Sequence, residues 1–288
     1  MRSRSSLFIG VLASVVFLAN QARASDIPER DSVPGVSSSA ETARFDLYQG
    51  YFIVVHGSIG PLKNLNFFLD TGTSPAVVDS GIARKLNLQE GGPASIVVVG
   101  GRTAGEEARL PSLEIGPVKQ TNLRVITADL SFFQRTLPVR IDGIVGLDVL
   151  GKQGPFAIDY PARVIRFGPA EPLAVSLPLH LDRGLAVFDA EIDHKPVHLL
   201  FDTGTYSLIL FSRATGQSPE STIAVREENR VWLRTLRMGA EEFRQKPALM
   251  AHNPKPSQLD FDGLMSPAAL GISRVSVDLK GGVLAFSR

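Results

Sequence analysis

The chain has 288 residues, of which 44% are hydrophobic, so it is long enough to bury one large core or two cores of ordinary size. Its 30 Lys and Arg residues nearly balance its 29 Asp and Glu residues, and the formal net charge is +1. The composition excludes a disordered chain, and because the charges form no long run of one sign, no nucleic-acid partner is expected.

The first residues have the three parts of a secretory signal peptide. Two arginines precede an apolar run of 13 residues, Leu7 to Ala19, and Ala22 and Ala24 form a small-x-small cleavage site. The run is shorter than the ~20 residues that a helix needs to cross a bilayer, which favours cleavage over a retained anchor. We therefore expect residues 1–24 to be removed near Ala24, giving a periplasmic or secreted protein without a stable membrane anchor.

Residues 25–42 are polar and rich in Pro, Gly and Ser, and predict a flexible leader. The chain has no cysteine, which excludes disulfide bonds and a thiolate nucleophile. The stability of the mature chain must therefore come from core burial.

Beyond the leader, one series of features occurs twice. Each series begins with two apolar runs around a turn, Tyr51 to Leu69 and Ala186 to Phe201, which predict β-hairpins. Each hairpin delivers the string DTGT at a strand end, at residues 70–73 and 202–205.

After each DTGT the paired features continue in one order. A short helix is predicted at Ser80–Leu88, with a weaker counterpart at Ser212–Ser218. Strands, Asp-Gly segments and closing hairpins follow in both halves: LEIG and LRMG, RVITADL and KPALMAH, IDGIVGLDVLG and FDGLMSPAALG, and FAIDYPARVIRF and VSVDLKGGVLAF.

The offset between paired features shrinks smoothly along the chain. It is 132 residues between the two DTGT strings, 123 between Gly116 and Gly239, and 120 between Asp142 and Asp262. Paired features in one order, at a slowly drifting offset, indicate an internal duplication rather than chance.

The duplication also predicts the domain organisation. The proline-rich segment Gly168–Pro178 is the expected linker, so we predict an N-terminal lobe at 43–168 and a C-terminal lobe at 169–288. Strand-like runs bounded by turn residues dominate both halves, and long stretches of helical period are missing from the sequence. The predicted fold class is therefore all-β.

A duplicated half-site would place Asp70 and Asp202 on either side of a pseudo-twofold axis. Two carboxyl groups that face each other closely cannot both ionise, so they share one proton, and their titration belongs to the pair. The ionised member can activate water as a base, and the protonated member can protonate a scissile amide. This chemistry hydrolyses peptides without a metal, a thiol or a serine-histidine pair.

The neighbours of each aspartate have physical roles in this interpretation. Gly72 and Gly204 allow a sharp turn and a close approach to the carboxylates. The other two residues of each string after the aspartate are threonines, whose hydroxyl groups can donate hydrogen bonds. We expect Thr71 and Thr203 to form hydrogen bonds across the axis. We expect Thr73 and Thr205 to donate to the outer carboxylate oxygens.

The two DTGT strings, each preceded by three apolar residues, with IDGIVGLDVL behind the first, resemble the aspartic protease clan. They are most similar to its retropepsin-like bacterial branch, as an exported aspartyl protease with two tandem half-domains. The resemblance covers about residues 45–288. It implies a bilobal pepsin-like or retropepsin-like fold with a six-stranded core, a water held by Asp70 and Asp202, and flaps that close over an extended peptide or protein substrate.

Two further assignments follow from the resemblance. Gly100 and Gly101 would form the tip of the first flap, Ser95–Ala108, and the second flap would be Thr222–Leu233. The apolar-apolar-Gly motif beneath the catalytic loop ends at Gly146 in the first half, but the second half has Leu264-Met265-Ser266. Because serine adds a side chain where the family packs tightly, we expect the second lobe to be looser or differently arranged there.

Simpler interpretations remain for several residues. Asp70 and Asp202 could each cap a turn at a strand end. His194 and His198 are the only close pair of histidines, and without further clustered ligands no metal site and no cofactor are expected. The other recurring aspartates lie in turn or hairpin contexts, for which we expect structural roles: Asp142, Asp262, Asp159 and Asp278.

Two functions from different classes are consistent with the sequence. The first is an exported aspartic endopeptidase that hydrolyses peptide bonds at Asp70 and Asp202. The second is a non-catalytic peptide- or partner-binding protein with the same bilobal fold, motivated by Ser266 and by a first flap without tyrosine. Because one chain carries both half-sites, we expect a monomer rather than a pair of chains.

Overall fold

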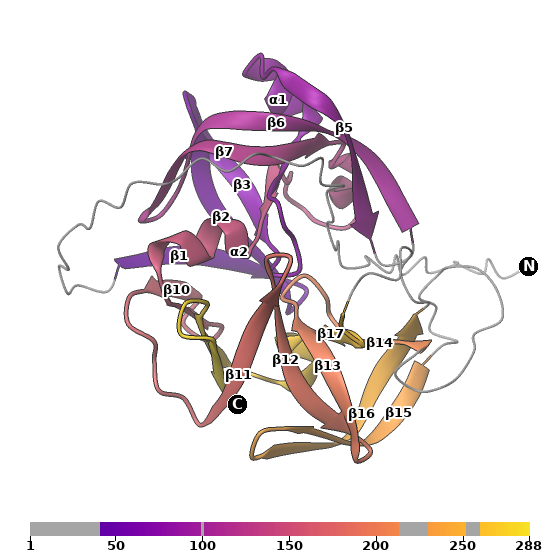
Figure 1. Cartoon of the computed structure of the whole chain (residues 1–288). Coiled ribbons are helices and arrows are strands. Elements are labelled where there is room, and N and C mark those ends of the chain that lie inside the picture. The colour runs from indigo at the N-terminus through magenta and orange to yellow at the C-terminus, as the bar shows by residue number, and fades with distance from the viewer. Residues whose placement is uncertain (1–40, 99–100, 213–229, 252–259) are drawn as a thin grey trace, which may run out of the picture.

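The structure is a computed structural model that describes residues 41–98, 101–212, 230–251 and 260–288. The predicted signal peptide, most of the predicted leader, Gly100, nearly all of the weaker helix candidate at 212–218 and residues 222–229 of the second flap lie outside these ranges. Within them, two β-rich lobes flank a layer of strands (Figure 1). In the described ranges, no helix is long and apolar enough to span a membrane.

The first lobe follows the predicted order of elements, including a short helix that begins at the predicted Ser80. Its elements are β1 (Glu41–Tyr48), β2 (Phe52–Ile59), β3 (Leu62–Leu69), β4 (Val77–Asp79), α1 (Ser80–Lys85), β5 (Glu90–Val98), β6 (Gly101–Ile115), β7 (Val118–Ala128), η1 (Ser131–Arg135), β8 (Gly143–Val145), α2 (Leu147–Leu150), η2 (Gly151–Gln153), β9 (Phe156–Asp159) and β10 (Val164–Phe167).

The second lobe repeats this order. Its elements are β11 (Val175–Asp182), β12 (Leu185–Ile192), β13 (Lys195–Phe201), β14 (Leu208–Phe211), β15 (Arg230–Met238), β16 (Glu241–Ala251), β17 (Gly263–Met265), α4 (Pro267–Leu270), β18 (Arg274–Asp278) and β19 (Val283–Ser287).

Each lobe closes its strands into a ring. In the first lobe the ring runs β2, β3, β8, β4, β7, β6 and back to β2. In the second it runs β12, β13, β17, β14, β16, β15 and back to β12. Each pairing has the same parallel or antiparallel sense as its counterpart, so the internal duplication predicted from the sequence is present in the strand topology.

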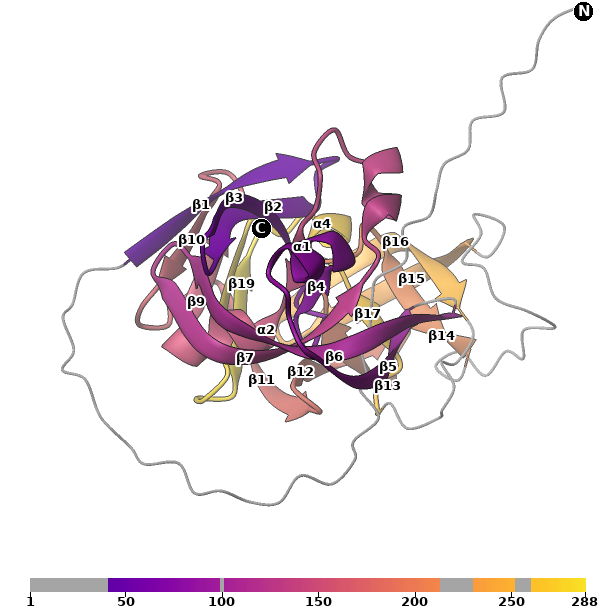
Figure 2. The same cartoon turned by 90° about the horizontal axis from the view of Figure 1, so that it is seen from above.

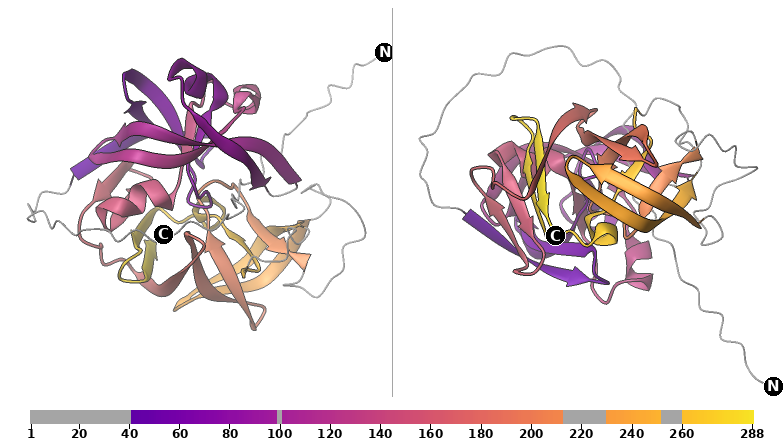
Figure 3. Two further views of the ribbon diagram at one scale, coloured as in Figure 1. Left: turned by 45° about the horizontal axis from the view of Figure 1, so that its top comes forward. Right: turned by 90° about the horizontal axis from the view of Figure 1, so that it is seen from below.

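A six-stranded sheet joins the lobes, in the order β1, β10, β9, β18, β19, β11. The closing hairpins of the two halves pair with each other at its centre, where β9 runs antiparallel to β18. Seen from above, the β9, β10 and β19 strands lie beside one another (Figure 2), and other views show this layer between the lobes (Figure 3). The sheet is the six-stranded core that the resemblance implied.

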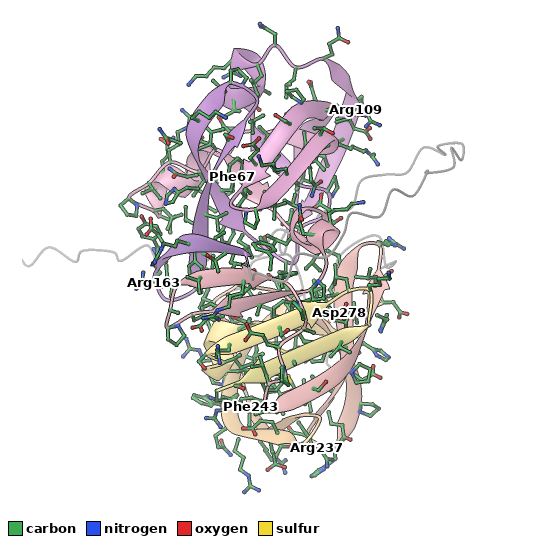
Figure 4. The ribbon with its side chains drawn as sticks, turned by 90° about the vertical axis from the view of Figure 1, so that its left-hand side faces the viewer. Phe67, Arg109, Arg163, Arg237, Phe243 and Asp278 are labelled. Atoms are coloured by element: carbon green, nitrogen blue, oxygen red, sulfur yellow. The ribbon has the colours of Figure 1, made fainter. Side chains whose placement is uncertain are left out.

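Short stretches of the ring strands, such as Phe52–Val55 of β2, are apolar without interruption because both of their faces are buried. Val55 and Ile53 pack into a core cluster that extends through both lobes, while their neighbours Phe52 and Val54 pack into a cluster whose buried members all lie in the first lobe. A strand buried on both faces has a continuous apolar run instead of the alternation of a half-exposed strand. Figure 4 shows Phe67 and Phe243 as part of the packing of different lobes.

The linker is shorter than predicted. The segment was expected to extend from Gly168 to Pro178, but β11 begins at Val175 and pairs with β19 through Pro178. At Pro178 the strand has a neighbour on one side only, because pairing with β12 starts at Leu179. A proline on an open side removes no ladder hydrogen bond, and so it does not prevent a strand there.

The expected structural role of Asp159 is confirmed. Its carboxylate accepts hydrogen bonds from the Ala162 N–H (2.9 Å), from Arg166 (3.0 Å) and from Arg274 of β18 (3.1 Å). Burial raises the pKa of this carboxyl group, but these donors outweigh burial and hold the pKa below its ordinary value. Asp159 therefore connects the closing hairpins of the two lobes.

Candidate active site

The two DTGT strings lie at equivalent places, one in each lobe. Asp70 directly follows β3, and its backbone N–H donates to the carbonyl oxygen of Val145 on β8 (2.9 Å). Asp202 directly follows β13, and its N–H donates to the carbonyl oxygen of Met265 on β17 (3.0 Å). Because β8 and β17 run parallel to β3 and β13, each pair of strands ends at the same edge and holds its loop there.

Four hydrogen bonds across the lobe boundary hold the two loops in register. The N–H of Thr71 donates to Oγ1 of Thr203 (3.1 Å), and the N–H of Thr203 donates to Oγ1 of Thr71 (3.0 Å). The Thr71 hydroxyl donates in turn to the carbonyl oxygen of Phe201 (2.9 Å), and the Thr203 hydroxyl to that of Leu69 (3.0 Å). This is the cross-axis bonding predicted for these two threonines.

The structure brings the two carboxyl groups together in a fully buried site. Asp70 and Asp202 both have 0% exposure, and their carboxyl groups are hydrogen-bonded to each other. The N–H of Gly72 donates to Oδ1 of Asp70 (2.9 Å), and that of Gly204 to Oδ1 of Asp202 (2.7 Å).

The electrostatics of the site favour a protonated carboxyl group. Burial raises the pKa of Asp70 well above its ordinary value, and the charge of Asp202 and the bond between the two groups raise it further. The Thr73 hydroxyl and the Gly72 N–H donate to Asp70 and partly offset this rise. Oδ2 of Asp70 is buried and has no hydrogen-bond partner among the described atoms.

The glycines of the two loops are required because there is no room for a side chain at these positions. A methyl group at Gly72 would lie 2.9 Å from Cγ of Asp202, and one at Gly204 would contact the carboxyl group of Asp70 even more closely. The predicted close approach is therefore present, and it is made to the aspartate of the opposite lobe. Neither glycine has a left-handed φ, so the backbone conformation is not what requires glycine here.

The Thr205 hydroxyl donates to the carbonyl oxygen of Ser207 (3.2 Å), a contact within its own loop. Thr73, its counterpart in the first lobe, donates to the carboxylate of Asp70.

Of the two alternatives expected at Ser266, looser packing is wrong and a different arrangement is confirmed. Ser266 is fully buried, its hydroxyl donates to the carbonyl oxygen of Thr205, and Oγ accepts from the Ala269 N–H (3.4 Å) to cap α4. A methyl group at Gly146, the equivalent residue, would collide with the carbonyl oxygen of Thr73. The backbone differs, with ψ of −154° at Gly146 and 123° at Ser266, and this rotation makes room for the serine side chain.

The first flap is a β5–β6 hairpin whose last described pair is Val98 with Gly101. Gly101 begins β6. In the second lobe, the described end of the predicted flap, 230–233, belongs to β15.

Asp142 and Asp262 have matching structural roles. Oδ2 of Asp142 accepts from the Asn66 N–H (3.0 Å), and Oδ2 of Asp262 accepts from the His198 N–H (2.9 Å). Each carboxylate therefore joins the start of the Asp-Gly segment to the preceding hairpin. His194 lies in the β12–β13 turn and not on the strand with His198.

Asp148, the second residue of α2, was not among the predicted site residues. Its Oδ2 accepts from the Ala76 N–H (2.8 Å), which fixes the chain just beyond the first DTGT string. Burial raises the pKa of this carboxyl group to about 6, against the lowering effect of the Ala76 N–H. A single carboxylate in the apolar string GLDVLG was the available signal, and the duplication offered no counterpart because the equivalent residue is Ala268.

One comparison with known proteins supports part of this assignment. Residues 55–149 match the model of a protein family described as aspartyl protease. This match includes the first DTGT and Gly146, and supports a protease domain in the first lobe. The crystal structure of basic 7S globulin from soybean is similar at 14% identity, over 86% of this chain and 94% of that chain, with a TM-score of 0.49. No curated protein matches the sequence.

The Thr71→Val substitution tests the interlobe hydrogen bonds. It keeps the side-chain shape but deprives the Thr203 N–H and the Phe201 carbonyl of a partner, so it should lower the free energy of unfolding by about 2–6 kcal/mol. Denaturant unfolding measures the loss. Thr42→Val, at an exposed position of β1, is the matched control and should change stability by less than about 0.5 kcal/mol. Equal losses in the two variants would contradict the assigned role.

Ser266→Ala and Gly146→Ala together test the packing beneath the two loops. Removing the Ser266 hydroxyl should destabilise the fold by about 1–3 kcal/mol, because the Thr205 carbonyl and the Ala269 N–H lose a partner. Gly146→Ala should be more damaging, because its methyl group meets backbone that cannot give way. Chemical denaturation of both variants checks the order, and a stabilised Ser266→Ala protein would show that serine is a defect after all.

Proposed function

We propose that the chain is an aspartic endopeptidase that hydrolyses peptide bonds with a water activated by Asp70 and Asp202. The observation that carries the proposal is the pair of fully buried carboxyl groups, one from each lobe, hydrogen-bonded to each other at the pseudo-twofold junction. Two aspartates that only capped turns would have no reason to meet. One chain supplies both half-sites, so the proposal requires only a monomer.

The proposed reaction uses one proton shared by the pair. The ionised carboxylate accepts a proton from water while the water oxygen bonds to the scissile carbonyl carbon, and the protonated carboxyl gives its proton to the carbonyl oxygen. Collapse of the tetrahedral intermediate breaks the carbon–nitrogen bond as the amine nitrogen takes up a proton from the pair, and a hydroxyl group of the intermediate returns its proton to the pair. Peptide and water thereby become a carboxylic acid and an amine. The partnerless Oδ2 of Asp70 supports a ligand position beside this carboxyl group.

The rise in the pKa of Asp70 gives the proposal a pH range. The pair can catalyse hydrolysis while it holds one proton. The buried environment keeps that proton bound at pH values above 3.8, the ordinary pKa of Asp. We expect a bell-shaped rate profile whose alkaline limb lies well above pH 3.8.

A second function, peptide binding without turnover, is favoured by one observation. Both aspartate side chains have no exposure to solvent, so a peptide reaches them only if covering residues move. Calorimetric titration with peptides separates the two functions. Binding to the wild type without cleavage, which survives Asp70→Asn, would favour the binding protein.

Asp70→Asn is expected to abolish proton exchange within the pair, and kcat/KM for peptide cleavage should fall by at least about a hundredfold. The same change should raise the melting temperature at pH 7 but not at pH 3. Because the folded-state pKa of Asp70 is raised, ionisation opposes folding as pH rises above the unfolded value, and asparagine removes that opposition. Cleavage assays and thermal unfolding at the two pH values test this.

Asp278→Asn is the matched control, because Asp278 recurs in the duplicated pattern but lies in the closing hairpin. It should retain cleavage. Full activity of Asp70→Asn, or no cleavage of a peptide library by the wild type between acidic and neutral pH, would refute the endopeptidase.

We further propose export, with cleavage of the signal peptide after Ala24, on the basis of the arginines, apolar run and small-x-small site of the first residues. Expression of the full chain in a bacterium and N-terminal sequencing of the periplasmic product should give a protein that begins at Ser25. Retention of Met1 in a soluble cytoplasmic product would refute this part of the proposal.

A further inference from the structure

The two lobes differ in the turn that leads from the interlobe sheet into each ring. In the second lobe Asp182 pairs with Leu185, so the β11–β12 turn has two residues. In the first lobe Tyr48 pairs with Phe52, so the β1–β2 turn is one residue longer.

The additional residue is Tyr51. The other two residues of the longer turn, Gln49 and Gly50, have positive φ values of 52° and 79°, and both residues of the shorter turn, Arg183 and Gly184, also have positive values, 52° and 84°. These pairs are therefore equivalent, and Tyr51 has no counterpart in the second lobe.

Each turn contacts the residue that follows the DTGT of the opposite lobe. The ring of Tyr51 lies 5.7 Å from the ring of Tyr206, between centroids, and Tyr206 directly follows the second DTGT. Gly184 lies so close to Ser74, which directly follows the first DTGT, that a methyl group on it would be 3.0 Å from Ser74 Oγ. The two contacts are related by the pseudo-twofold axis, but one is aromatic and the other is small and polar.

The aromatic contact has a buried part and an accessible part. Tyr51 is 6% exposed and also packs on Phe52, with ring centroids 4.3 Å apart, whereas Tyr206 is 36% exposed. Burial, and to a lesser extent Tyr206, raises the pKa of Tyr51, so its phenol is neutral at any physiological pH. A supported aromatic surface thus lies four residues from Asp202, while the equivalent position beside Asp70 has no large side chain.

We infer that Tyr206, supported by Tyr51, determines substrate specificity and the direction in which a peptide binds. A pseudo-symmetric pair of carboxyl groups by itself accepts an extended peptide in either direction. An aromatic surface on one side and serine with glycine on the other remove that equivalence. The preferred substrate class therefore has a large apolar or aromatic side chain on one side of the scissile bond and a small one on the other. This inference rests on the proposed function.

Two non-cleavable peptides provide the test. Each carries a central statine-type hydroxyl group; one has Phe before it and Ala after it, and the other has these two residues exchanged. Wild-type protein should bind one of them at least about tenfold more tightly, the range expected for filling an apolar pocket. Tyr206→Ser, which copies Ser74, should reduce the preference to less than about threefold by weakening only the favoured peptide, and Tyr206→Phe should retain it.

The outcomes separate this inference from the proposed function. Equal binding of the two peptides by the wild type, or an unchanged preference in Tyr206→Ser, would overturn the inference and leave the endopeptidase intact. A weakening of both peptides by the same factor in Tyr206→Ser would show a merely structural role for Tyr206 and would also overturn it. Binding of neither peptide by the wild type would overturn the proposed function and this inference together. Circular dichroism confirms that each variant is folded.

Discussion

A carboxyl group that loses its water needs hydrogen bonds or a proton in exchange, and two such groups in contact need both. Asp70 and Asp202 meet under this constraint, and the architecture around them satisfies it. The glycine amides donate to the carboxylates, and the threonine bonds prevent the loops from separating. The parallel strands β8 and β17 hold each loop from behind.

Much of the fold could be predicted because the duplication made each weak local signal count twice. The hairpins, the first helix and the order of strands follow from turns and apolar runs that recur in both halves. The predicted end of the linker was wrong because its last residues form a strand only by pairing with β19, which lies more than a hundred residues away in the sequence. From the local sequence, Pro178 predicts the end of a strand. Only the long-range arrangement shows that the side of the strand to which an N–H would point at this position has no partner strand. The closure of each ring likewise depends on such long-range pairs.

The candidate site divides in a similar way. The aspartates, the cross-axis threonines and the close approach of the glycines follow from the chemistry of the DTGT string. The sequence left looser packing and a different arrangement open at Ser266, because the outcome depends on a backbone angle that residue identity does not reveal. Asp148 and Tyr51 were missed for another reason. Their partners, Ala76 and Tyr206, are distant in the sequence. In addition, neither Asp148 nor Tyr51 has an equivalent residue in the other half of the duplication.

Ring closure has a consequence for how the protein behaves at high concentration. An open β-sheet ends in backbone donors and acceptors to which a second chain can add a strand, and that is a common start of aggregation. Here each ring strand is paired on both sides over at least part of its length, and the outer strands of the interlobe sheet, β1 and β11, continue into pairing with β2 and β12. The chain has no cysteine with which to brace itself covalently. Protection against self-association therefore depends on the closed pairing of the strands. A substitution that opens a ring would lower solubility even where it leaves the chemistry of the site unchanged.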